Sequence, residues 1–499
     1  MPDIPFLMLD DKSSSVPLYR QIYEEIRRAI LGGKLVSGTR LPASRVLAKQ
    51  LSVSRLTVVN AFEQLLAEGY LEGRTGAGTF VASRLPEDLL QISAAEKNAG
   101  GAQSSPEKVK ISKFAARLIE TNTRASRFES ATRTLAFKNG LTAVSEFPFE
   151  IWEKIAARVY RQSRYKISGY GEAAGYRPLR EAVAAHFAAA RGVRCDIEQI
   201  FIVNGAQQAL DLISRVLLEA GEKIWIEDPC YQEALGVFRA VGCEVIPVTV
   251  DAEGFNLAEA QTRSDAAKLV YITPSHQYPT GVTMSLARRL SLLEWARRSN
   301  TWIIEDDYNS EFRYAGRPLA SLQNLDTTGR VIYVGTFSKT IFPALRLGCL
   351  IVPRNLIEIL RAARWSGDCH SPIFEQAILA DFIAEGHFAR HIRRMRTLYE
   401  KRQYFLVEEV EKQLKGLLKV SKAASGMHLI GWLAEGFDEL EVAEKAFASG
   451  LHLMPLSTYC IENKLPAGVI LGYTGFDEKE IKQGIGKLKQ VLESMKKAS

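Results

Sequence analysis

Two apolar segments in the C-terminal half of the chain end in residues that could carry out covalent chemistry. One runs from Trp302 into Glu305-Asp306-Asp307-Tyr308, and the other runs from Val331 into Thr336-Phe337-Ser338-Lys339. Open α/β sheets bind ligands at the carboxyl ends of their strands. Pyridoxal 5'-phosphate (PLP) chemistry needs an amine for a Schiff base, a carboxylate for the pyridinium nitrogen, an aromatic ring and donors for a phosphate. The order of these residues, with Lys339 placed 33 residues after Asp306, predicts a PLP site.

A set of polar residues near the N-terminus has the spacing of a DNA-reading helix. In a helix-turn-helix, the second helix presents its N-terminal side chains to base edges in the major groove. Arg55 can read a guanine edge, and Asn60 can read an adenine or contact the backbone. Ser54 and Thr57 lie on the same exposed side of the predicted helix. Further residues suited to phosphate or minor-groove contacts are Arg45, Arg74 and Thr79.

The elements that must position these polar residues read as a winged helix-turn-helix over residues 15–83. Apolar residues repeat every four positions from Leu18 to Ile30, which predicts an amphipathic helix that ends at Gly32-Gly33. A short second helix is expected over residues 41–51, and Ser54 is placed to cap a third. Two short strands then flank a glycine-containing tip at residues 74–78, which is the expected wing.

The rest of the chain predicts a linker followed by a large α/β domain. Residues 84–133 are rich in Ala, Ser, Gly, Lys and Glu and show no clean period, so we interpret them as a linker that is partly helical. Over residues 134–495, apolar runs alternate with helical segments, which indicates a mostly parallel sheet. The runs that predict its strands are residues 201–203, 223–226, 269–272, 302–304 and 331–334.

Composition narrows the class of protein without identifying it. The net charge of +7 over 499 residues permits nucleic-acid binding but does not require it, and residues 1–83 carry ten Lys and Arg against eight Asp and Glu. The six cysteines lack paired spacing, which argues against a disulfide framework or a zinc site. No apolar run reaches membrane-spanning length and no signal peptide is apparent, so a cytoplasmic protein is expected.

The N-terminal motifs resemble the signature of the GntR family of regulators, and their order and spacing carry the DNA-binding prediction more than charge does. The matching stretches are residues 38–45, 53–58, 66–71 and 76–81. Residues 134–495 resemble the fold-type I aminotransferases. The whole chain is therefore similar to the MocR-type regulators, the GntR subfamily with an aminotransferase-like domain.

This resemblance implies roles for individual residues. Lys339 would carry the cofactor as a Schiff base, Asp306 would pair with the pyridine nitrogen, and Tyr308 would hydrogen-bond the ring hydroxyl. Tyr231 would stack on the ring, and Tyr170 would reach the phosphate from the partner subunit. The residues that match the remaining phosphate ligands are Ala206 and Gln207 at a helix N-terminus, and Thr336, Ser338 and Arg346.

Two positions depart from the aminotransferase pattern. Tyr278 stands before Pro279-Thr280-Gly281 where the enzymes carry an asparagine, and the form His-Gln-aromatic resembles the regulators. Ile470 stands where the enzymes carry the arginine that clamps the carboxylate of an amino acid. A bidentate arginine is the natural group to orient a carboxylate, so the isoleucine counts against ordinary transamination. An arginine from elsewhere, such as Arg393 or Arg394, remains an alternative.

The resemblance implies a cytoplasmic, PLP-binding transcriptional regulator that binds a double-stranded DNA operator as a head-to-tail homodimer. Its effector would be a small amine, an amino acid or PLP itself; the family effectors include γ-aminobutyrate, taurine and D-alanyl-D-alanine. Effector binding would shift the populations of two conformations. The alternatives are an active PLP-dependent aminotransferase with a fused DNA-binding domain, and a binding module that has lost PLP.

Overall fold

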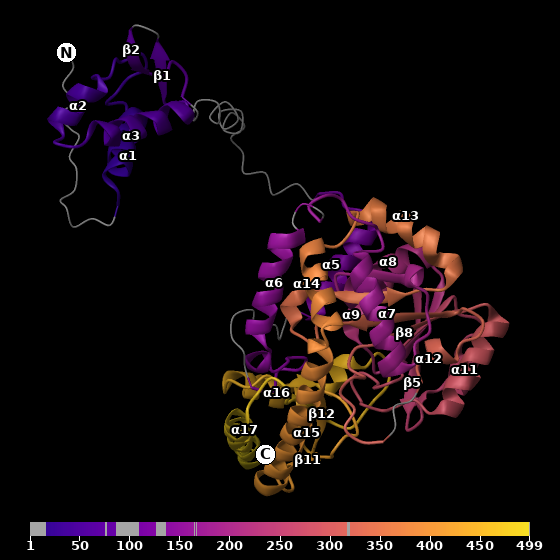
Figure 1. Cartoon of the computed structure of the whole chain (residues 1–499). Coiled ribbons are helices and arrows are strands. Elements are labelled where there is room, and N and C mark those ends of the chain that lie inside the picture. The colour runs from indigo at the N-terminus through magenta and orange to yellow at the C-terminus, as the bar shows by residue number, and fades with distance from the viewer. Residues whose placement is uncertain are drawn as a thin grey trace. The chain divides into compact units, whose positions relative to one another are not determined.

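The computed structural model describes residues 16–74, 77–85, 109–125, 136–163, 165, 167–316 and 320–498. The chain divides into two compact units, Met1–Lys110 and Ile111–Ser499, and each is described by itself. Figure 1 shows the first unit in indigo and the second in the colours from purple to yellow. In the described part of the chain, helices long and apolar enough to cross a membrane are absent.

The first unit is a winged helix-turn-helix, as the sequence predicts. Its described residues form α1 (Leu18–Leu31), α2 (Ser44–Gln50), α3 (Arg55–Ala67), β1 (Leu71–Arg74) and β2 (Gly78–Val81). The two strands pair in antiparallel register from Leu71 opposite Val81 to Arg74 opposite Gly78. The two residues at the tip of the predicted wing, 75 and 76, lie outside the described residues.

Local sequence signals explain where these helices begin and end. Three residues of the predicted face of α1 are buried, with Ile22, Ile26 and Ile30 at most 3% exposed, whereas Leu18 at the start of the helix is 44% exposed. The backbone N–H of Gly32 donates to carbonyls of the last turn and ends this helix. The Ser54 hydroxyl accepts the backbone N–H of Thr57 at 3.1 Å, which satisfies one of the free donors at the start of α3.

The second unit is built around an eight-stranded sheet. In spatial order its strands are β3 (Ile200–Val203), β10 (Gly348–Ile351), β9 (Val331–Thr336), β8 (Trp302–Asp307), β7 (Leu269–Ile272), β4 (Lys223–Asp228), β5 (Glu244–Asp251) and β6 (Gly254–Phe255). β4, β5, β7, β8 and β9 are parallel neighbours, whereas β10 runs antiparallel to both β3 and β9. The five apolar runs that predict strands all form strands of this sheet.

Both faces of this sheet are buried, which explains why its strands read as continuous apolar runs. Ile224 and Ile226 of β4 join one cluster of core residues, and Trp225 between them joins another. The helices connected to the sheet are α7 (Arg177–Arg191), α8 (Ala206–Leu217), α9 (Gln232–Val241), α10 (Leu257–Arg263), α11 (Leu286–Ser299), α12 (Leu322–Leu325), α13 (Ile357–Asp368) and α14 (Ile373–Ala384).

A smaller sheet forms the C-terminal part of this unit. Its strands, in spatial order, are β11 (Leu418–Val420), β12 (His428–Leu433), β14 (Gly468–Gly472) and β13 (Met454–Pro455), all antiparallel. Figure 1 shows α16 and α17 at the same end of the unit as β11 and β12. The remaining helices are α6 (Phe149–Ser163), α15 (His387–Gln413), α16 (Glu439–Ala448) and α17 (Glu478–Ala498), with single turns at Val144–Glu146, Ile197–Gln199, Pro343–Leu345, Arg354–Leu356 and Leu456–Tyr459.

The predicted linker contains a helix that packs on the large unit. This helix, α5 (Lys113–Ala125), belongs to the second unit and contacts α9. The Arg117 guanidinium donates to the carbonyls of Ala240 and Val241 at 2.8 and 2.9 Å. Residues 86–108 and 126–135 of the predicted linker lie outside the described residues.

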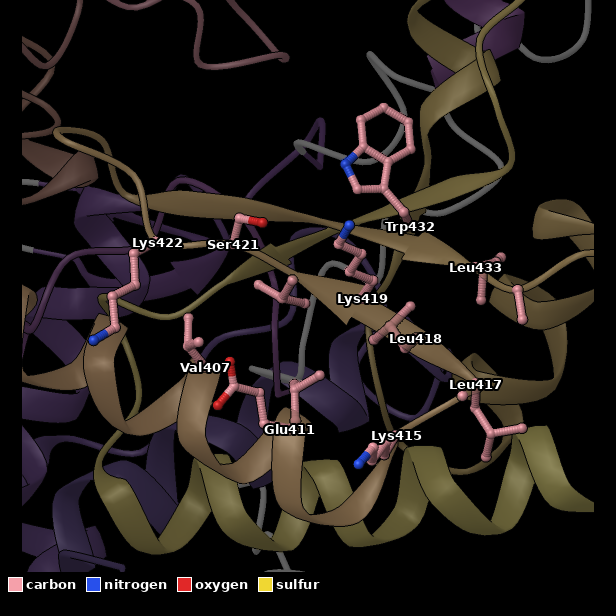
Figure 2. A pocket seen from close by; sticks show the side chains of 14 residues that line it. Val407, Glu411, Lys415, Leu417, Leu418, Lys419, Ser421, Lys422, Trp432 and Leu433 are labelled. Carbon is pink, nitrogen blue, oxygen red and sulfur yellow. The ribbon is translucent and has the colours of Figure 1, made fainter.

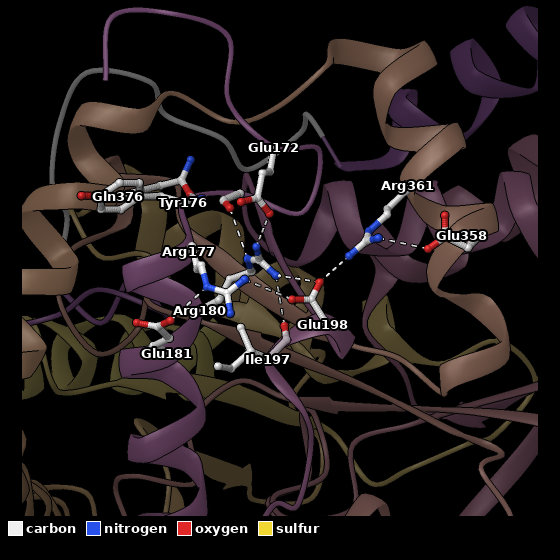
Figure 3. A network of polar contacts seen from close by, with 11 residues as sticks. Glu172, Tyr176, Arg177, Arg180, Glu181, Ile197, Glu198, Glu358, Arg361 and Gln376 are labelled. Carbon is white, nitrogen blue, oxygen red and sulfur yellow. Dashed lines mark hydrogen bonds and ion pairs between the residues drawn. The ribbon is translucent and has the colours of Figure 1, made fainter. Parts of the chain in front are cut away.

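A buried arginine fixes the segment that leads into α7. The Arg180 side chain is 0% exposed, and it donates to the carbonyl of Gly175 at 3.2 Å and to Glu172 (Figure 3). Another of its nitrogens lies 3.6 Å from Glu198, which belongs to the single turn before β3. Because an unpaired buried charge is costly, Arg180 ties residues 172–175 to the start of the sheet.

The cap at Ser54 should be measurable in the intact protein. We expect Ser54→Ala to destabilise α3 by about 1 kcal/mol, which corresponds to about fivefold faster amide exchange. Hydrogen–deuterium exchange of peptides that cover residues 55–67 measures this effect. Ser54→Asp keeps an acceptor at the cap and should restore protection; equal exchange in Ser54→Ala and the unchanged protein would contradict the role of the cap.

Candidate cofactor site and DNA-binding face

The carboxyl ends of β8 and β9 bring the predicted cofactor residues together. The two strands are parallel, with Asp306 opposite Val334, so Asp306 and the segment Thr336–Lys339 leave the sheet at the same edge. β3 reaches this edge as well and leads through Gly205 into α8. The ends of three strands therefore meet at one edge of the sheet, where open α/β sheets bind ligands, and we call this candidate site the Lys339 crevice.

Lys339 is held by a backbone carbonyl from a distant segment. Its Nζ atom donates to the carbonyl of Gly140 at 3.1 Å. A side chain at position 140 would place its Cβ 2.5 Å from Nζ, so only glycine allows this approach. Burial lowers the pKa of the Lys339 amine, Glu233 raises it and Arg346 lowers it. A lowered pKa gives more of the neutral amine, which is the form that attacks a carbonyl.

One carboxylate oxygen of Asp306 has no hydrogen-bond partner among the described residues. Its Oδ2 atom accepts the Tyr271 hydroxyl at 2.7 Å, whereas Oδ1 is buried and has no partner among the described residues. Burial raises the pKa of Asp306 to about 7, against the opposing effect of the Tyr271 hydrogen bond. A buried carboxylate with one free oxygen is suited to accept the N–H of a pyridinium ring. The site therefore fits the ring nitrogen of PLP.

The phosphate end of the site is formed at the N-terminus of α8. Gly205, with φ of 88°, precedes the helix, and the backbone amides of Ala206 and Gln207 lie in its first turn. The Arg346 guanidinium lies over this turn and donates to the carbonyl of Asn204 at 3.0 Å. A Cβ at position 205 would be 3.1 Å from Arg346, so the glycine makes room for the cation. A helix N-terminus beside an arginine is suited to a phosphate.

The hydroxyls after β9 complete this end. The Thr336 hydroxyl accepts the backbone N–H of Ser338 at 3.1 Å, which fixes the turn. The Ser338 hydroxyl is buried and has no partner among the described residues. An unpartnered buried hydroxyl is suited to a phosphate oxygen, so these residues fit the predicted ligand set.

Three tyrosine side chains lie at the part of the site that is predicted to hold the pyridine ring of PLP. Tyr278 lies edge-on to both Tyr231 and Tyr308, with ring centroids 5.8 and 5.7 Å apart. The Tyr308 hydroxyl is buried without a partner among the described residues, and burial raises its pKa, so it stays protonated. It is therefore suited to hydrogen-bond the ring hydroxyl of PLP. The stacking of Tyr231 on that ring stays a prediction.

Sequence motifs did not point to several residues that shape the site. Tyr271 orients Asp306, and Gly140 receives Lys339. Asn139 donates to the Tyr278 hydroxyl at 3.0 Å, and that hydroxyl donates to Tyr459 at 3.2 Å. These residues come from segments far from the Asp306 and Lys339 motifs. Only the tertiary fold brings them to the site.

Ile470 is fully buried in β14 of the small sheet. It pairs with Ile430 of β12, while Gly472, two residues further on, shares its face and pairs with His428. A Cβ at Gly472 would lie 2.6 Å from the carbonyl of Lys138, next to the segment that holds Lys339. The side chain at this position is apolar, and its correspondence to the arginine of the aminotransferases stays a prediction.

The two alternative arginines, Arg393 and Arg394, form no hydrogen bond or ion pair with the cofactor site among those described. Arg394 pairs with Glu146 at 3.0 Å and is more than half exposed. For Arg393, the described hydrogen bonds include only that of its carbonyl with the Thr397 hydroxyl, at 3.4 Å.

Tyr170 stands apart from the Lys339 crevice within one chain. Its side chain is 87% exposed, and its ring lies 6.4 Å from Trp365 and 6.2 Å from His370. The described ring contacts of Tyr170 lie outside the Lys339 crevice, so its contact with a phosphate stays a prediction.

The predicted DNA contacts gather on α3, α2 and the hairpin of the first unit. Arg55 and Asn60 are exposed, whereas Thr57 is half-buried and its hydroxyl lies 2.8 Å from that of Ser54. Arg45 is exposed on α2. Ser54 and Thr57 are thus engaged with each other, and Arg55 and Asn60 remain open to a ligand.

The side chain of Arg74 is held by two other residues of the β1–β2 hairpin. Arg74 pairs with Glu72 at 2.6 Å and lies over the Phe80 ring, 4.6 Å from its centroid. Thr79 is half-buried on the paired strand. Arg40, which the polar pattern did not single out as a contact, lies over Gly78, where a Cβ would be 3.2 Å from its Nε. Two guanidinium groups therefore flank this hairpin.

A groove of about 930 Å³ lies elsewhere, between the end of α15 and the edge strand β11 (Figure 2). Its lining includes Glu411, Lys419 and Trp432, and it contains none of the predicted site residues. Its size alone does not make it the functional site, because the chemistry-bearing residues lie at the strand ends.

Comparisons with known proteins agree with both units. Residues 18–81 match "Bacterial regulatory proteins, gntR family", and residues 142–467 match "Aminotransferase class I and II". "Probable rhizopine catabolism regulatory protein MocR" of Rhizobium meliloti is 37% identical over 97% of this chain and 96% of that protein. "HTH-type pyridoxine biosynthesis transcriptional regulator PdxR" of Corynebacterium glutamicum is 31% identical over 97% of each.

Solved structures resemble the large unit. LysN, the α-aminoadipate aminotransferase of Thermus thermophilus complexed with N-(5'-phosphopyridoxyl)-L-leucine, matches with a TM-score of 0.70 and 27% identity over 78% of this chain and 98% of that chain. The fold and site thus define a GntR-type winged helix-turn-helix joined to a PLP-binding, aminotransferase-like unit. The chain belongs to the MocR-type GntR family of transcriptional regulators.

The raised pKa of Asp306 makes the cofactor-free protein sensitive to pH. An aspartate of the unfolded chain has a pKa of about 3.9, and that of folded Asp306 is about 7. The folded state therefore binds more protons between these values, and the buried charge costs stability as the pH rises through them. Asp306→Asn should raise the free energy of unfolding of the cofactor-free protein at pH 8, by at most about 4 kcal/mol, and leave it unchanged near pH 4.

Tryptophan fluorescence during urea unfolding reports this effect, since all six tryptophans lie in the large unit. Asp211→Asn is the control, because its carboxylate is 44% exposed and pairs with Arg215. A gain for Asp306→Asn that is the same at pH 4 and pH 8 would contradict the buried charge.

Proposed function

We propose that the protein is a PLP-dependent sensor that changes its affinity for an operator when a small amine, an amino acid or PLP occupies the large unit. The DNA-binding arm is the GntR-type unit, and the input is the crevice around Lys339. The similarity to named transcriptional regulators along 97% of the chain supports regulation. Ile470 favours a regulator over an active aminotransferase, because a buried isoleucine cannot orient a substrate carboxylate.

The residues of the crevice have separate tasks toward PLP. The cofactor, when bound, supplies an aldehyde that reacts with amines and a ring that withdraws electrons. Lys339 would hold the aldehyde carbon, and Asp306 would hold the proton at the ring nitrogen. Arg346, Ser338 and the first turn of α8 would bind the phosphate. The low pKa of Lys339 favours release of its amine in neutral form when another amine takes its place.

The binding event can serve regulation without turnover. The free amine of Lys339 donates to the carbonyl of Gly140, which belongs to the segment packed against β14. Bonding to the cofactor would take the amine away from this carbonyl, and displacement by another amine would allow the contact again. A ligand shifts an equilibrium by the difference in its affinity for two conformations. We infer that the occupied and unoccupied crevice favour different arrangements of this segment, and that this difference reaches the operator.

A homodimer completes this proposal. The exposed Tyr170 supports an intersubunit phosphate contact, since its described ring contacts lie outside the Lys339 crevice of its own chain. A head-to-tail arrangement would place the DNA-binding unit of one chain against the large unit of the other. A dimer also implies paired operator half-sites. We place this regulator in the cytoplasm, where it would meet its operator.

The coupling between crevice and operator can be tested on DNA duplexes selected from a random library by the PLP-loaded protein. Addition of γ-aminobutyrate, taurine or excess PLP should change duplex affinity at least about fivefold for one of them. Lys339→Ala should abolish the change and the yellow, borohydride-sensitive absorbance of the bound cofactor. Lys268→Ala, a partly exposed lysine paired with Glu222, should behave as the unchanged protein. Equal ligand responses in both variants would contradict the proposed input.

The competing function is an active aminotransferase with a fused DNA-binding unit. Mixing the PLP-loaded protein with candidate amino donors and a keto acid distinguishes the two functions. The regulator is expected to complete at most one half-reaction per site. Sustained turnover would favour the enzyme and show that an arginine is not needed at position 470.

Two arginines should affect DNA binding differently. Arg55→Ala should weaken specific binding by about 1 to 3 kcal/mol and reduce discrimination between selected and random duplexes. Arg74→Ala should weaken binding to both duplexes alike and reduce the slope of log affinity against log salt by about 1. Fluorescence anisotropy over a range of salt concentrations measures both effects. Unchanged discrimination in Arg55→Ala, or an unchanged slope in Arg74→Ala, would contradict the assigned contact.

A further inference from the structure

The first turn of the DNA-reading helix carries an exposed apolar side chain between two polar ones. Leu56 is 67% exposed, more than any other large apolar side chain described within residues 16–85. It lies between Arg55 and Thr57, directly after the Ser54 cap. Exposed leucines occur singly on many surfaces, so the position of Leu56 matters more than its exposure alone.

The geometry of α3 places Leu56 on the outward side of the helix. The helix buries Val58, Ala61, Phe62 and Leu65 against the domain core. Residues three and four apart share a helix face, so Leu56 and Asn60 form a row away from the buried residues. Arg55 and Thr57 lie on either side of this row. Leu56 is thus central on the surface that a major groove would meet.

A shallow hollow adjoins this row. It has a volume of about 220 Å³ and lies between the start of α1 and the start of α3. Its lining is Leu18, Tyr19, Ser54, Leu56, Thr57 and Asn60. The lining of this hollow therefore combines apolar side chains with hydroxyl and amide groups.

We propose that Leu56 is a specificity-determining residue that contacts the 5-methyl group of a thymine in the operator. This inference rests on the DNA-binding function of the first unit. In the major groove, each base presents hydrogen-bond donors or acceptors, and thymine alone adds a methyl group. A leucine offers no partner to a donor or acceptor, and pressing it against one would cost desolvation without a hydrogen bond. Against a methyl group, both surfaces leave water.

The size of the effect follows from the single methyl group involved. Burial of one such group contributes about 0.8 kcal/mol, so removing the thymine methyl should weaken binding about threefold to fivefold for each contact. Uracil in place of thymine removes only this methyl and keeps every hydrogen-bonding group. The substitution therefore isolates the proposed contact.

The test uses the full-length PLP-loaded protein and duplexes that it selects from a random library. Each thymine of the selected site is replaced in turn by deoxyuridine, and affinities are measured by fluorescence anisotropy. The unchanged protein should lose affinity about threefold to fivefold at one thymine position in each half-site. Leu56→Ala should bind the selected duplex more weakly and show no further loss at that same position. The four affinities, with and without Leu56 and with thymine or uracil, form a double-mutant cycle. A coupling between the two changes assigns the contact with the thymine methyl group to Leu56.

Matched variants keep the result interpretable. Val36 is 64% exposed and lies outside α3, so Val36→Ala should retain both the affinity and the uracil effect. Because Leu56 is exposed, its substitution should leave α3 protected in hydrogen exchange. If Leu56→Ala keeps the full uracil effect at every position, or binds all duplexes as tightly as the unchanged protein, the proposal is wrong. If the unchanged protein selects no sequence at all, the proposed DNA-binding function fails instead.

Discussion

The structure depends on how it buries three consecutive carboxylates at the end of β8. Glu305 lies 3.9 Å from Arg289 and accepts two backbone N–H groups, and these contacts oppose the rise in its pKa that burial causes. Asp307 pairs with Arg191 on the other side. Asp306, between them, has no cationic partner among the described residues. A buried charge without a partner is expensive, so the fold leaves at this point a place for a cationic group that it does not itself supply. The pyridinium of PLP is such a group.

The parallel sheet converts this local constraint into a site. Adjacent strands end at the same edge, so Asp306 on β8 fixes where the segment after β9 must bring Lys339. The crevice then has a cation, Arg346, at one end and the Asp306 carboxylate deep in the sheet. A molecule with a phosphate at one end and a basic ring nitrogen at the other matches this distribution of charge. This distribution of charge, together with the Tyr308 hydroxyl, which is unpaired among the described residues, therefore fits the cofactor.

Local signals in the sequence predicted what depends on neighbours along the chain. The cap at Ser54 follows from residue types a few positions apart, and the five buried strands follow from continuous apolar runs. Lys339 and Asp306 could be paired because strand ends must meet at one edge. Tyr271 and Gly140 could not, because their roles arise from contacts with segments 35 and 199 residues away. The helix α5 inside the predicted linker owes its place to bonds with α9, which composition does not reveal.

The proposed function gives the isoleucine at position 470 a physical meaning, since an enzyme fold would serve there as a sensor. Catalysis requires interactions that are stronger in the transition state than in the ground state, and a substrate held firmly at both ends can use its binding energy for that purpose. Sensing requires only that the ligand bind two conformations with different affinity. Without a carboxylate clamp, an amino acid would lose its orientation, but Lys339 could still give up its place on the cofactor to another amine. In the proposed function, this exchange would decide whether the amine of Lys339 contacts the carbonyl of Gly140. Under that proposal, a site that does not orient a substrate for turnover would still report that an amine is present.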